Sequence, residues 1–221
     1  MALRHKTRQH LPDDLVADDV VLVSPDGSAI GVANRTEVHT DETPLHLAFS
    51  TYLFNARGEV LLTRRALTKK TWPGVWTNSC CGHPRPAESL GDAARRRIRE
   101  ELGLTVGPLV PLLPDFRYRA ELDGIVENEM CPVVTARAVS APAPDPTEVD
   151  AFAWVEWEAF SEEVCAGTRS VSVWSEEQIG RLRALGPRAS WWPASPERLP
   201  PAALWSPGAQ PWMNSAMVLS I

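Results

Sequence analysis

A thiol and an imidazole lie two residues apart at Cys81 and His83, within residues 78–84. The chain of 221 residues holds only four cysteines and five histidines, so this segment brings together two scarce and reactive side chains. A thiol in this setting can transfer a proton or act as a nucleophile. The alternative is that Cys81 is a small buried apolar residue. This is the commoner fate of a free cysteine, and the one we expect for Cys80 and Cys131.

A second set of side chains has the chemistry of a metal site. His39, His46 and His83 supply three imidazoles, and Glu127 and Glu129 are two residues apart in a predicted strand. Alternate residues of a strand point to the same side, so both carboxylates face one way. Such a donor set suits Zn²⁺, Mn²⁺ or Fe²⁺, and its oxygen-rich variants suit Mg²⁺ or Mn²⁺. The alternative is a hydrogen-bonded strand histidine at His46 and a solvated face at the two glutamates.

Basic side chains gather in two places, although the net charge of the chain is −6. One group precedes the tryptophan-rich loop and consists of Arg64, Arg65, Lys69 and Lys70. The other lies on one predicted helix and consists of Arg95, Arg96, Arg97 and Arg99. Such clustering in an acidic protein indicates a pocket for a phosphate-bearing small molecule. For Arg95, Arg96 and Arg99 an ordinary solvated face is the favoured alternative.

The composition is that of a soluble globular protein, with 44% hydrophobic and 23% charged residues. The negative net charge argues against a general nucleic-acid binder. No stretch is apolar enough to predict a membrane span or a secretory signal, so we expect no membrane partner. The four scattered cysteines do not resemble a disulfide framework, which predicts a reducing, cytoplasmic location. We expect a flexible tail at 1–19 and a single domain at 20–221.

The alternation of apolar residues predicts the elements that must position these side chains. We expect a hairpin over 20–32 and further strands at 45–55, 59–65, 109–113, 116–122, 125–139 and 149–157. An ordered loop is predicted at 68–79. The clearest helix is Ser89–Leu102, ended by Gly103, with Leu90, Ala94, Ile98 and Leu102 facing the core. Further helices are expected from Ser161, from Ser175 with a capping box, and at 212–221. This mixture predicts an α+β fold with a mixed sheet.

Together these residues resemble the type 1 isopentenyl-diphosphate isomerases, which have the Nudix fold. Seven segments match that family in its order: His39–Thr40, Leu45–Ser50, Thr63–Ala66, Trp72–Ser79, Cys81–Pro84, Asp115–Arg119 and Gly124–Glu129. The resemblance runs from about Val20 to Trp157, with a further match at Pro211–Met213. It implies a mixed β-sheet core flanked by helices. Residues 162–205 are then an extra helical and irregular elaboration, which either covers the sheet or helps to close the pocket or to form an oligomer contact.

The Nudix pattern departs from its usual form at one position. It runs through Gly82, Glu88, Arg96, Glu100, Glu101 and Gly103. By this resemblance, Arg97 stands at the position where a Nudix hydrolase has the first metal-binding glutamate of its Arg-Glu step. A cation there suits binding of a diphosphate and weakens a hydrolytic metal cluster. The departure favours an isomerase over the two alternatives, a Nudix pyrophosphohydrolase and a non-enzymatic diphosphate-binding or metal-binding module.

The resemblance implies interconversion of isopentenyl diphosphate and dimethylallyl diphosphate through a tertiary carbocation. It implies that Cys81 and Glu129 transfer protons on opposite sides of the carbon chain, that Tyr118 assists Glu129, and that Trp212 stabilises the cation. The diphosphate contacts it implies are Arg35, Arg65, Lys69 and Arg97. Asn78 and Trp72 are expected to shape the pocket.

The resemblance also implies two metal sites. One Mn²⁺, Zn²⁺ or Mg²⁺ is expected in the site of His39, His46, His83, Glu127 and Glu129. A Mg²⁺ ion is expected to bridge the diphosphate, the Glu101 carboxylate and the Cys81 backbone carbonyl. The only partner implied is a small prenyl diphosphate, and we expect a monomer or a weak homodimer.

Overall fold

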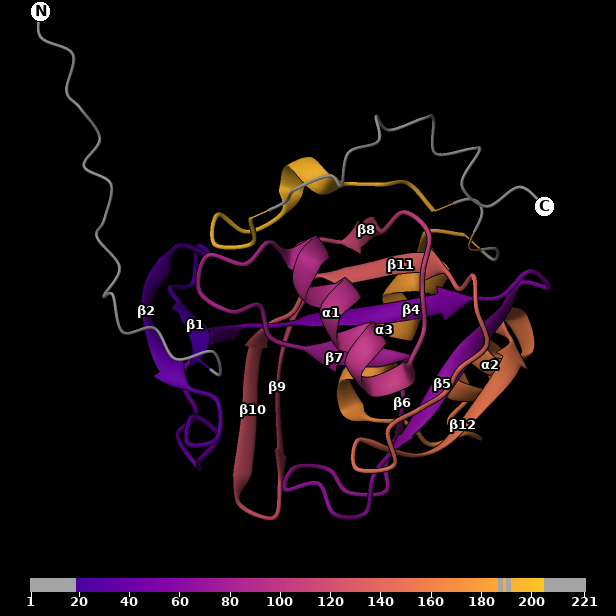
Figure 1. The fold of residues 1–221 in the computed structure, drawn as a ribbon, viewed down its shortest axis with the longest axis horizontal. Coiled ribbons are helices and arrows are strands. Elements are labelled where there is room, and N and C mark those ends of the chain that lie inside the picture. Colours follow the sequence, from indigo (N-terminus) through magenta and orange to yellow (C-terminus); the bar gives the residue numbers. More distant parts are fainter. Residues whose placement is uncertain (1–18, 187–188, 190–191, 205–221) are drawn as a thin grey trace, which may run out of the picture.

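The computed structural model describes residues 19–186, 189 and 192–204, which form two mixed sheets with three α-helices (Figure 1). The first sheet has the strand order β2-β1-β3-β10-β9. Its members are β1 (Asp19–Val23), β2 (Ala29–Asn34), β3 (His46–Leu47), β9 (Arg117–Leu122) and β10 (Ile125–Met130). The predicted tail lies outside the described residues apart from Asp19, which begins β1. The predicted helix at 212–221 also lies outside them.

The second sheet has the strand order β12-β5-β4-β11-β8, with two short strands, β6 and β7, paired to β5 and β4. Its members are β4 (Phe49–Phe54), β5 (Glu59–Arg65), β6 (Trp76–Thr77), β7 (Cys80–Gly82), β8 (Val110–Leu113), β11 (Val133–Arg137) and β12 (Val149–Glu156). The end of the predicted loop at 68–79 is therefore a strand, because β6 pairs with β5 through Thr63 and Arg64.

Two stretches of chain pass from the first sheet to the second side by side. β3 runs parallel to β10, and its continuation β4 runs parallel to β11. At the crossing the Ala48 amide donates to the Met130 carbonyl at 2.9 Å and the Ser50 amide to the Pro132 carbonyl at 3.1 Å. The predictions of single strands over 45–55 and 125–139 are thus wrong. Pro132 has no N–H with which to continue a ladder, while the apolar alternation runs through the crossing unchanged.

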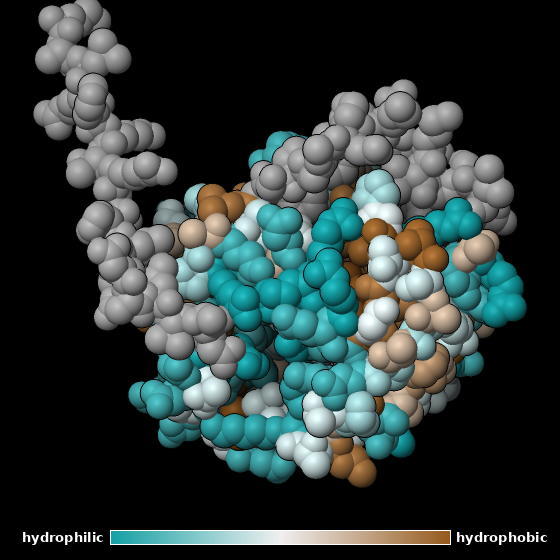
Figure 2. Space-filling view, in the orientation of Figure 1, coloured by the Kyte–Doolittle hydropathy of each residue, from teal (hydrophilic) through white to brown (hydrophobic). Residues whose placement is uncertain are grey.

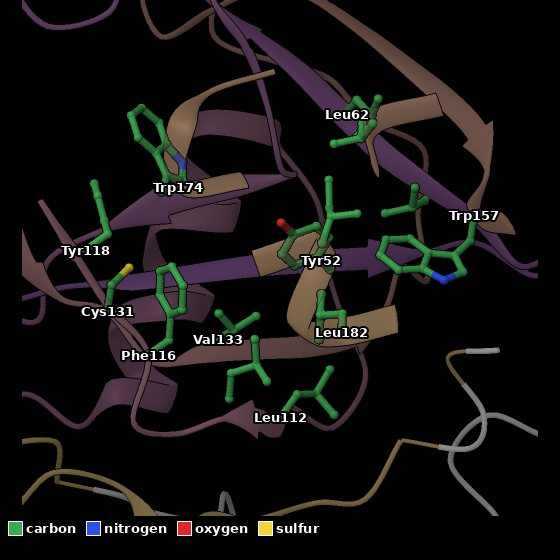
Figure 3. Close-up of a cluster of buried hydrophobic side chains, with 14 of the residues drawn as sticks. Tyr52, Leu62, Leu112, Phe116, Tyr118, Cys131, Val133, Trp157, Trp174 and Leu182 are labelled. Carbon is green, nitrogen blue, oxygen red and sulfur yellow. The ribbon is translucent and has the colours of Figure 1, made fainter. Parts of the chain in front are cut away.

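Helices cover both faces of the second sheet (Figure 1). Alternate residues of β4 separate the two cores. Phe49 and Leu53 pack with α1 (Leu90–Leu102), whereas Tyr52 and Phe54 pack on the opposite face, where α2 (Trp157–Cys165) and α3 (Val173–Ala184) lie. Figure 3 shows Tyr52 and Leu182 of α3 within this second core. The α+β prediction with a mixed sheet is confirmed.

The helix α1 begins and ends as its sequence predicts. The Ser89 hydroxyl accepts a hydrogen bond from the Asp92 amide at 3.1 Å, which satisfies one of the free N–H groups of the first turn. Gly103 caps the other end at φ 59°, a left-handed conformation that glycine adopts without strain. The four predicted core positions of this helix are all fully buried. A rigid α1 therefore carries its charged face to a fixed place beside β7.

The starts of the two later helices were predicted wrongly. α2 begins at Trp157 rather than at Ser161, because the Glu156 carboxylate caps it by accepting from the amides of Glu158 and Ala159. α3 begins at Val173 and is capped by Ser172, so the predicted capping box from Ser175 does not form. A short 3-10 turn, η2 (Pro196–Arg198), follows within the predicted irregular region.

Candidate active site

The chemically reactive side chains converge where the chain crosses between the sheets. His46 lies on β3 and pairs with Glu129 of β10, while Cys81 of β7 pairs with Ser50 of β4. The two adjacent cysteines point to opposite faces, as neighbours in a strand must. Cys80 packs into the core beneath α1, whereas Cys81 packs against the core that α3 covers. The fold therefore decides which of the two thiols lies on the side of the sheet that α3 covers.

Three histidines and a glutamate point at a common centre. Single ligand atoms of His39, His46, His83 and Glu129 all lie within 4.8 Å of one another. His83 Nε2 is 3.0 Å from Glu129 Oε1 and 3.2 Å from His46 Nε2. His46 Nδ1 lies 2.9 Å from the Pro44 carbonyl. A carbonyl only accepts, so Nδ1 carries a proton, and Nε2 is the His46 atom that faces the centre.

Glu127 adjoins this cluster through His39 and supplies a test of whether a cation fits. His39 Nε2 and Glu127 Oε2 lie 3.0 Å apart, but they are not aligned as a hydrogen bond. Neither buried atom has another hydrogen-bond partner among the described residues. Two unsatisfied lone-pair donors beside two further imidazoles fit a divalent cation, which would satisfy all of them at once. Since Glu127 and Glu129 are both buried, a solvated face for this pair is excluded.

The Glu129 carboxylate is held by donors on two sides. Tyr118, its cross-strand partner on β9, donates from its hydroxyl to Glu129 Oε2 at 2.9 Å. Burial alone would raise the pKa of Glu129, but its contacts with His46 and His83 hold that pKa well below its usual range. Burial raises the pKa of Tyr118 well above its ordinary value, so the phenol stays a neutral donor. The carboxylate is therefore ionised and oriented.

The Cys81 thiol lies between two polar side chains. Its sulfur donates to Asn78 Oδ1 at 3.2 Å and lies 3.4 Å from Ser50 Oγ. Burial raises the pKa of Cys81 to about 11, so the resting group is a neutral thiol with a proton to give. Cys81 also lines the cavity of the site. Cys80 and Cys131 are buried, as predicted for both.

A cavity of about 440 Å³ opens beside these groups, and much of its wall is basic. All four predicted diphosphate contacts, Arg35, Arg65, Lys69 and Arg97, line it, together with Lys70, Arg85 and Arg96. Figure 2 shows hydrophilic side chains gathered over α1 on this face of the molecule. His39, His83, Glu127 and Glu101 lie on the same wall, whereas Glu129 and Tyr118 do not line the cavity. The cavity is therefore lined both by the basic side chains and by His83, which belongs to the cluster of His39, His46, His83 and Glu129.

The charged face of α1 is tied to this wall. Arg97 pairs with Glu101, with Glu100 at 3.1 Å and with Glu148 at 3.4 Å. Arg96 forms two bonds to Glu88, each of 2.8 Å, and donates to the His83 carbonyl at 3.2 Å. An ordinary solvated face is therefore wrong for Arg96, whereas Arg99 is exposed as that alternative expects. α1 thereby helps to fix the backbone of His83.

The Glu101 carboxylate and the Cys81 carbonyl, which are predicted to share a second metal ion, both lie close to the Cys80 sulfur. Cys80 Sγ lies 3.3 Å from Glu101 Oε2 and 3.6 Å from the Cys81 carbonyl oxygen. This places the carboxylate and the carbonyl close together beside β7. Both are hard oxygen donors of the kind that Mg²⁺ prefers.

Trp174 is a site residue that the sequence did not reveal. Its buried ring lies 5.5 Å from the Tyr118 ring and 5.6 Å from the Trp72 ring, measured between centroids (Figure 3 shows Trp174 and Tyr118). Its indole N–H donates to Asn78 Oδ1 at 3.1 Å, the same oxygen that accepts from Cys81. Trp174 therefore touches partners of both Cys81 and Glu129. Trp212, the tryptophan assigned to the cation, lies outside the described residues.

A signal for this contribution was present in α3. Trp174, Gln178 and Leu182 recur at four-residue spacing, so they share one face of the helix. All three are buried, and Gln178 is fully buried with both ends of its amide hydrogen-bonded. A glutamine in an otherwise apolar stripe marks a polar partner in the core. The elaboration at 162–205 thus supplies site contacts rather than only an outer cover.

Comparison with known proteins agrees with this geometry. The family model described as NUDIX domain matches residues 44–174. The curated isopentenyl-diphosphate Delta-isomerase of Saccharopolyspora erythraea is 52% identical over 193 residues, which cover 86% of this chain and 100% of the relative. The chain belongs to the isopentenyl-diphosphate Delta-isomerase family. The Frankia alni isomerase is 55% identical, over 74% of this chain and 85% of its own length.

Solved structures support the fold independently of this family. A Deinococcus radiodurans crystal structure matches with a TM-score of 0.54 at 20% identity, over 74% of this chain and 98% of that one. A MutT protein from Methanosarcina mazei matches with a TM-score of 0.51 at 22% identity, over 65% and 96%. Together with the match to the NUDIX domain model, these similarities show that the chain has the Nudix fold. None of the helices among its described residues is long and apolar enough to cross a membrane.

Proposed function

We propose that the protein interconverts isopentenyl diphosphate and dimethylallyl diphosphate, the allylic isomerisation that supplies isoprenoid precursors. One observation carries the proposal beyond family membership. A neutral thiol at Cys81 and an ionised, tyrosine-bound carboxylate at Glu129 lie in one site, beside a cavity with a basic wall. A proton donor next to a proton acceptor is what an alkene shift requires, whereas a module that only binds would need neither.

The reaction moves one double bond with no net change in atoms. A proton adds to the terminal methylene carbon, whose π electrons form the new C–H bond and leave a tertiary cation on the neighbouring carbon. A proton then leaves the allylic carbon next to the diphosphate-bearing one, and its bonding pair becomes the new double bond. The two protons enter and leave different carbons, so two groups placed on either side of the chain serve better than one.

Cys81 and Glu129 take these two roles in the proposal. Cys81 enters the reaction protonated, because burial keeps its thiol neutral. Glu129 enters ionised, and the Tyr118 hydroxyl at 2.9 Å holds Oε2 in place while Oε1 faces His83. The hydroxyl also gives Glu129 a donor whose bond lengthens or shortens as the carboxylate gains or loses a proton.

The five-residue cluster is proposed to hold one Mn²⁺, Zn²⁺ or Mg²⁺ ion through His39, His46, His83, Glu127 and Glu129. A bound divalent ion would polarise the Glu129 carboxylate and fix its orientation. The misaligned pair of His39 and Glu127 supports this assignment, because both atoms lack a hydrogen-bond partner within the described chain. A Mg²⁺ ion accompanying the diphosphate is assigned to the Glu101 carboxylate and the Cys81 carbonyl.

Four cations are proposed to bind the diphosphate: Arg35, Arg65, Lys69 and Arg97. They share the cavity wall with Cys81, so a diphosphate held there keeps the short carbon chain within reach of the thiol. Arg97 is positioned by Glu101 and Glu148, and Lys69 also pairs with Glu148. These carboxylates hold the cations in place before a substrate arrives.

Trp174 is proposed to give the carbocation its aromatic face. A tertiary cation is destroyed by water and stabilised by the electron-rich face of an indole. Trp174 has the required contacts to Tyr118 and to the Asn78 amide that also binds Cys81. The prediction that Trp212 has this role remains a prediction, and the two tryptophans are compared directly in the Discussion.

The protein is further proposed to act in the cytoplasm as a monomer or a weak homodimer. The four cysteines are all free, which suits a reducing compartment. Sedimentation of the purified chain over a range of concentrations tests the oligomeric state, and a tight higher oligomer would contradict it.

Product analysis tests the proposed reaction. The protein is incubated with isopentenyl diphosphate and Mg²⁺, and both the prenyl products and the released phosphate are quantified. We expect dimethylallyl diphosphate without phosphate release. Phosphate release without isomerisation would instead support a Nudix pyrophosphohydrolase, and binding without any product would support a non-catalytic module.

A further inference from the structure

The polar groups around Cys81 form a connected set whose hydrogen-bond directions can be deduced from the groups at its ends. Asn78 comes first, because its amide has partners of fixed character. Its Nδ2 faces the carbonyl oxygens of Thr51 at 3.1 Å and Cys80 at 3.0 Å, which only accept. Its Oδ1 faces the indole N–H of Trp174, which only donates. The orientation of the Asn78 amide is therefore settled, with its oxygen toward Cys81.

The direction of the Cys81 hydrogen bond follows from this orientation. Asn78 Oδ1 has no hydrogen to give, so the 3.2 Å contact requires the Cys81 thiol to donate. The only proton of the thiol is then engaged. The 3.4 Å contact between Cys81 Sγ and Ser50 Oγ is a hydrogen bond only if the Ser50 hydroxyl donates to the sulfur.

Gln178 of α3 enforces that direction at Ser50. With its hydrogen directed at Cys81, Ser50 Oγ must accept from its other neighbours. Gln178 Nε2 donates to it at 3.0 Å, and Gln178 Oε1 accepts from the Tyr52 hydroxyl at 3.0 Å. The remaining neighbour, the Cys131 thiol at 3.4 Å, can donate to Ser50 as well. Every member is satisfied in one arrangement, and the Tyr52, Gln178 and Ser50 side chains are all fully buried.

We propose that Gln178 is a positioning residue for Cys81: its amide N–H keeps the Ser50 hydroxyl proton directed at the Cys81 sulfur, so that the thiol proton cannot turn toward Ser50. The inference rests on the proposed function of Cys81 as a proton-transfer group. Gln178 touches no substrate and acts only through Ser50. Its effect is on the orientation of the reacting proton rather than on substrate binding.

Loss of the amide frees the Ser50 hydroxyl to rotate. Ser50 Oγ could then accept the Cys81 proton, and a competing thiol orientation, directed away from Asn78 and into the core, becomes populated. We expect kcat to fall in proportion to the population of the reactive orientation, while KM stays unchanged because the cationic wall is untouched. One correctly directed hydrogen bond to a reacting group corresponds to a fall of roughly 10-fold.

The test compares steady-state kinetics of isopentenyl diphosphate conversion in the full-length protein and its variants. Gln178→Met keeps the length of the side chain but removes both polar ends, and we expect kcat to fall roughly 10-fold with KM unchanged. Ser50→Ala should lower kcat at least as much. The double variant should match Ser50→Ala alone, because Gln178 acts through Ser50.

Thr135→Val is the matched control. Thr135 is buried in β11 of the same sheet, and its hydroxyl donates at 2.8 Å to the backbone carbonyl of Tyr52 rather than to a side chain of the set. The Thr135→Val substitution should lower the Tm as Gln178→Met does, yet leave kcat unchanged. If Gln178→Met fails to fold, Tyr52→Phe serves as the second variant. It removes the donor that fixes the amide and should lower kcat by a smaller factor.

Several outcomes would overturn the inference. Full kcat in a folded Gln178→Met protein would do so, as would a rise in KM with kcat unchanged, or multiplying effects of Gln178→Met and Ser50→Ala. In each of these cases the wild-type protein still converts its substrate, so the proposed function stands. A wild-type protein that makes no dimethylallyl diphosphate would instead refute the proposed function, and the inference with it.

Discussion

Arg97 replaces a carboxylate of the usual Nudix pattern, and its removal separates the roles of this cation in substrate binding and in stability. We expect Arg97→Gln to raise KM for isopentenyl diphosphate because the cavity wall loses a charge beside the diphosphate. One charge-assisted hydrogen bond contributes about 1.5–3 kcal/mol. That free energy converts to a rise of roughly 10- to 100-fold in KM. kcat should change much less, since Arg97 transfers no proton in the proposed mechanism.

The same substitution should lower the free energy of unfolding. Arg97 has a side-chain exposure of only 16%, and its removal leaves Glu101 and Glu148 without this partner. Breaking a buried ion pair by removing one member costs about 3–5 kcal/mol. Glu148 keeps Lys69 as a second partner, so we expect a loss of about 2–3 kcal/mol. In a chain of this size the loss corresponds to a fall in Tm of about 5–10 °C.

Arg99→Gln is the control, because it removes the same charge from the same helix at an exposed position. Initial rates over a range of isopentenyl diphosphate concentrations give KM, and thermal unfolding monitored by circular dichroism gives Tm. An Arg97→Gln protein with the KM and Tm of Arg99→Gln would refute the reasoning. A rise in KM without a change in Tm would refute only the claim that the ion pairs of Arg97 stabilise the fold.

Three further outcomes are expected. Tyr118→Phe should lower kcat roughly 10- to 100-fold, because Glu129 loses its 2.9 Å hydrogen bond, and unchanged kcat would exclude that role. Trp174→Leu should lower kcat more than Trp212→Leu does in parallel assays, and the reverse order would restore Trp212 as the cation-stabilising ring. Added Mn²⁺ or Zn²⁺ should raise the Tm of chelator-treated protein, and His39→Ala should lose much of that rise; an equal rise in both proteins would place the ion elsewhere.

Local sequence patterns predict those parts of the fold that depend on local physics. α1 has the predicted caps at Ser89 and Gly103 and the predicted core face, because capping and helical periodicity are set within a few residues. The hairpin of β1 and β2 is likewise local. The crossing between sheets at Ala48 and Pro132 is not, since the alternation of apolar residues in the sequence passes through it without a break.

The site divides in the same way. The family motifs name His39, His46 and His83, and the structure brings them together with Glu129 even though they lie far apart in the chain. The contributions of α3 were missed, because Trp174 and Gln178 approach the Cys81 environment from more than 90 residues further along the chain. Such contacts depend on which face of β4 each helix covers, and that is a property of the packing rather than of any local motif.

The central claim is that Cys81 and Glu129 transfer the two protons of an allylic isomerisation. The direct measurement is conversion of isopentenyl diphosphate in deuterated water by the wild-type protein and by Cys81→Ala and Glu129→Gln. The wild type should form dimethylallyl diphosphate with deuterium in a methyl group.

Each variant should lose at least roughly 100-fold in rate, since general acid–base groups contribute that much or more. Folded variants with near-wild-type rates, or a wild-type product that carries no deuterium from solvent, would contradict the account.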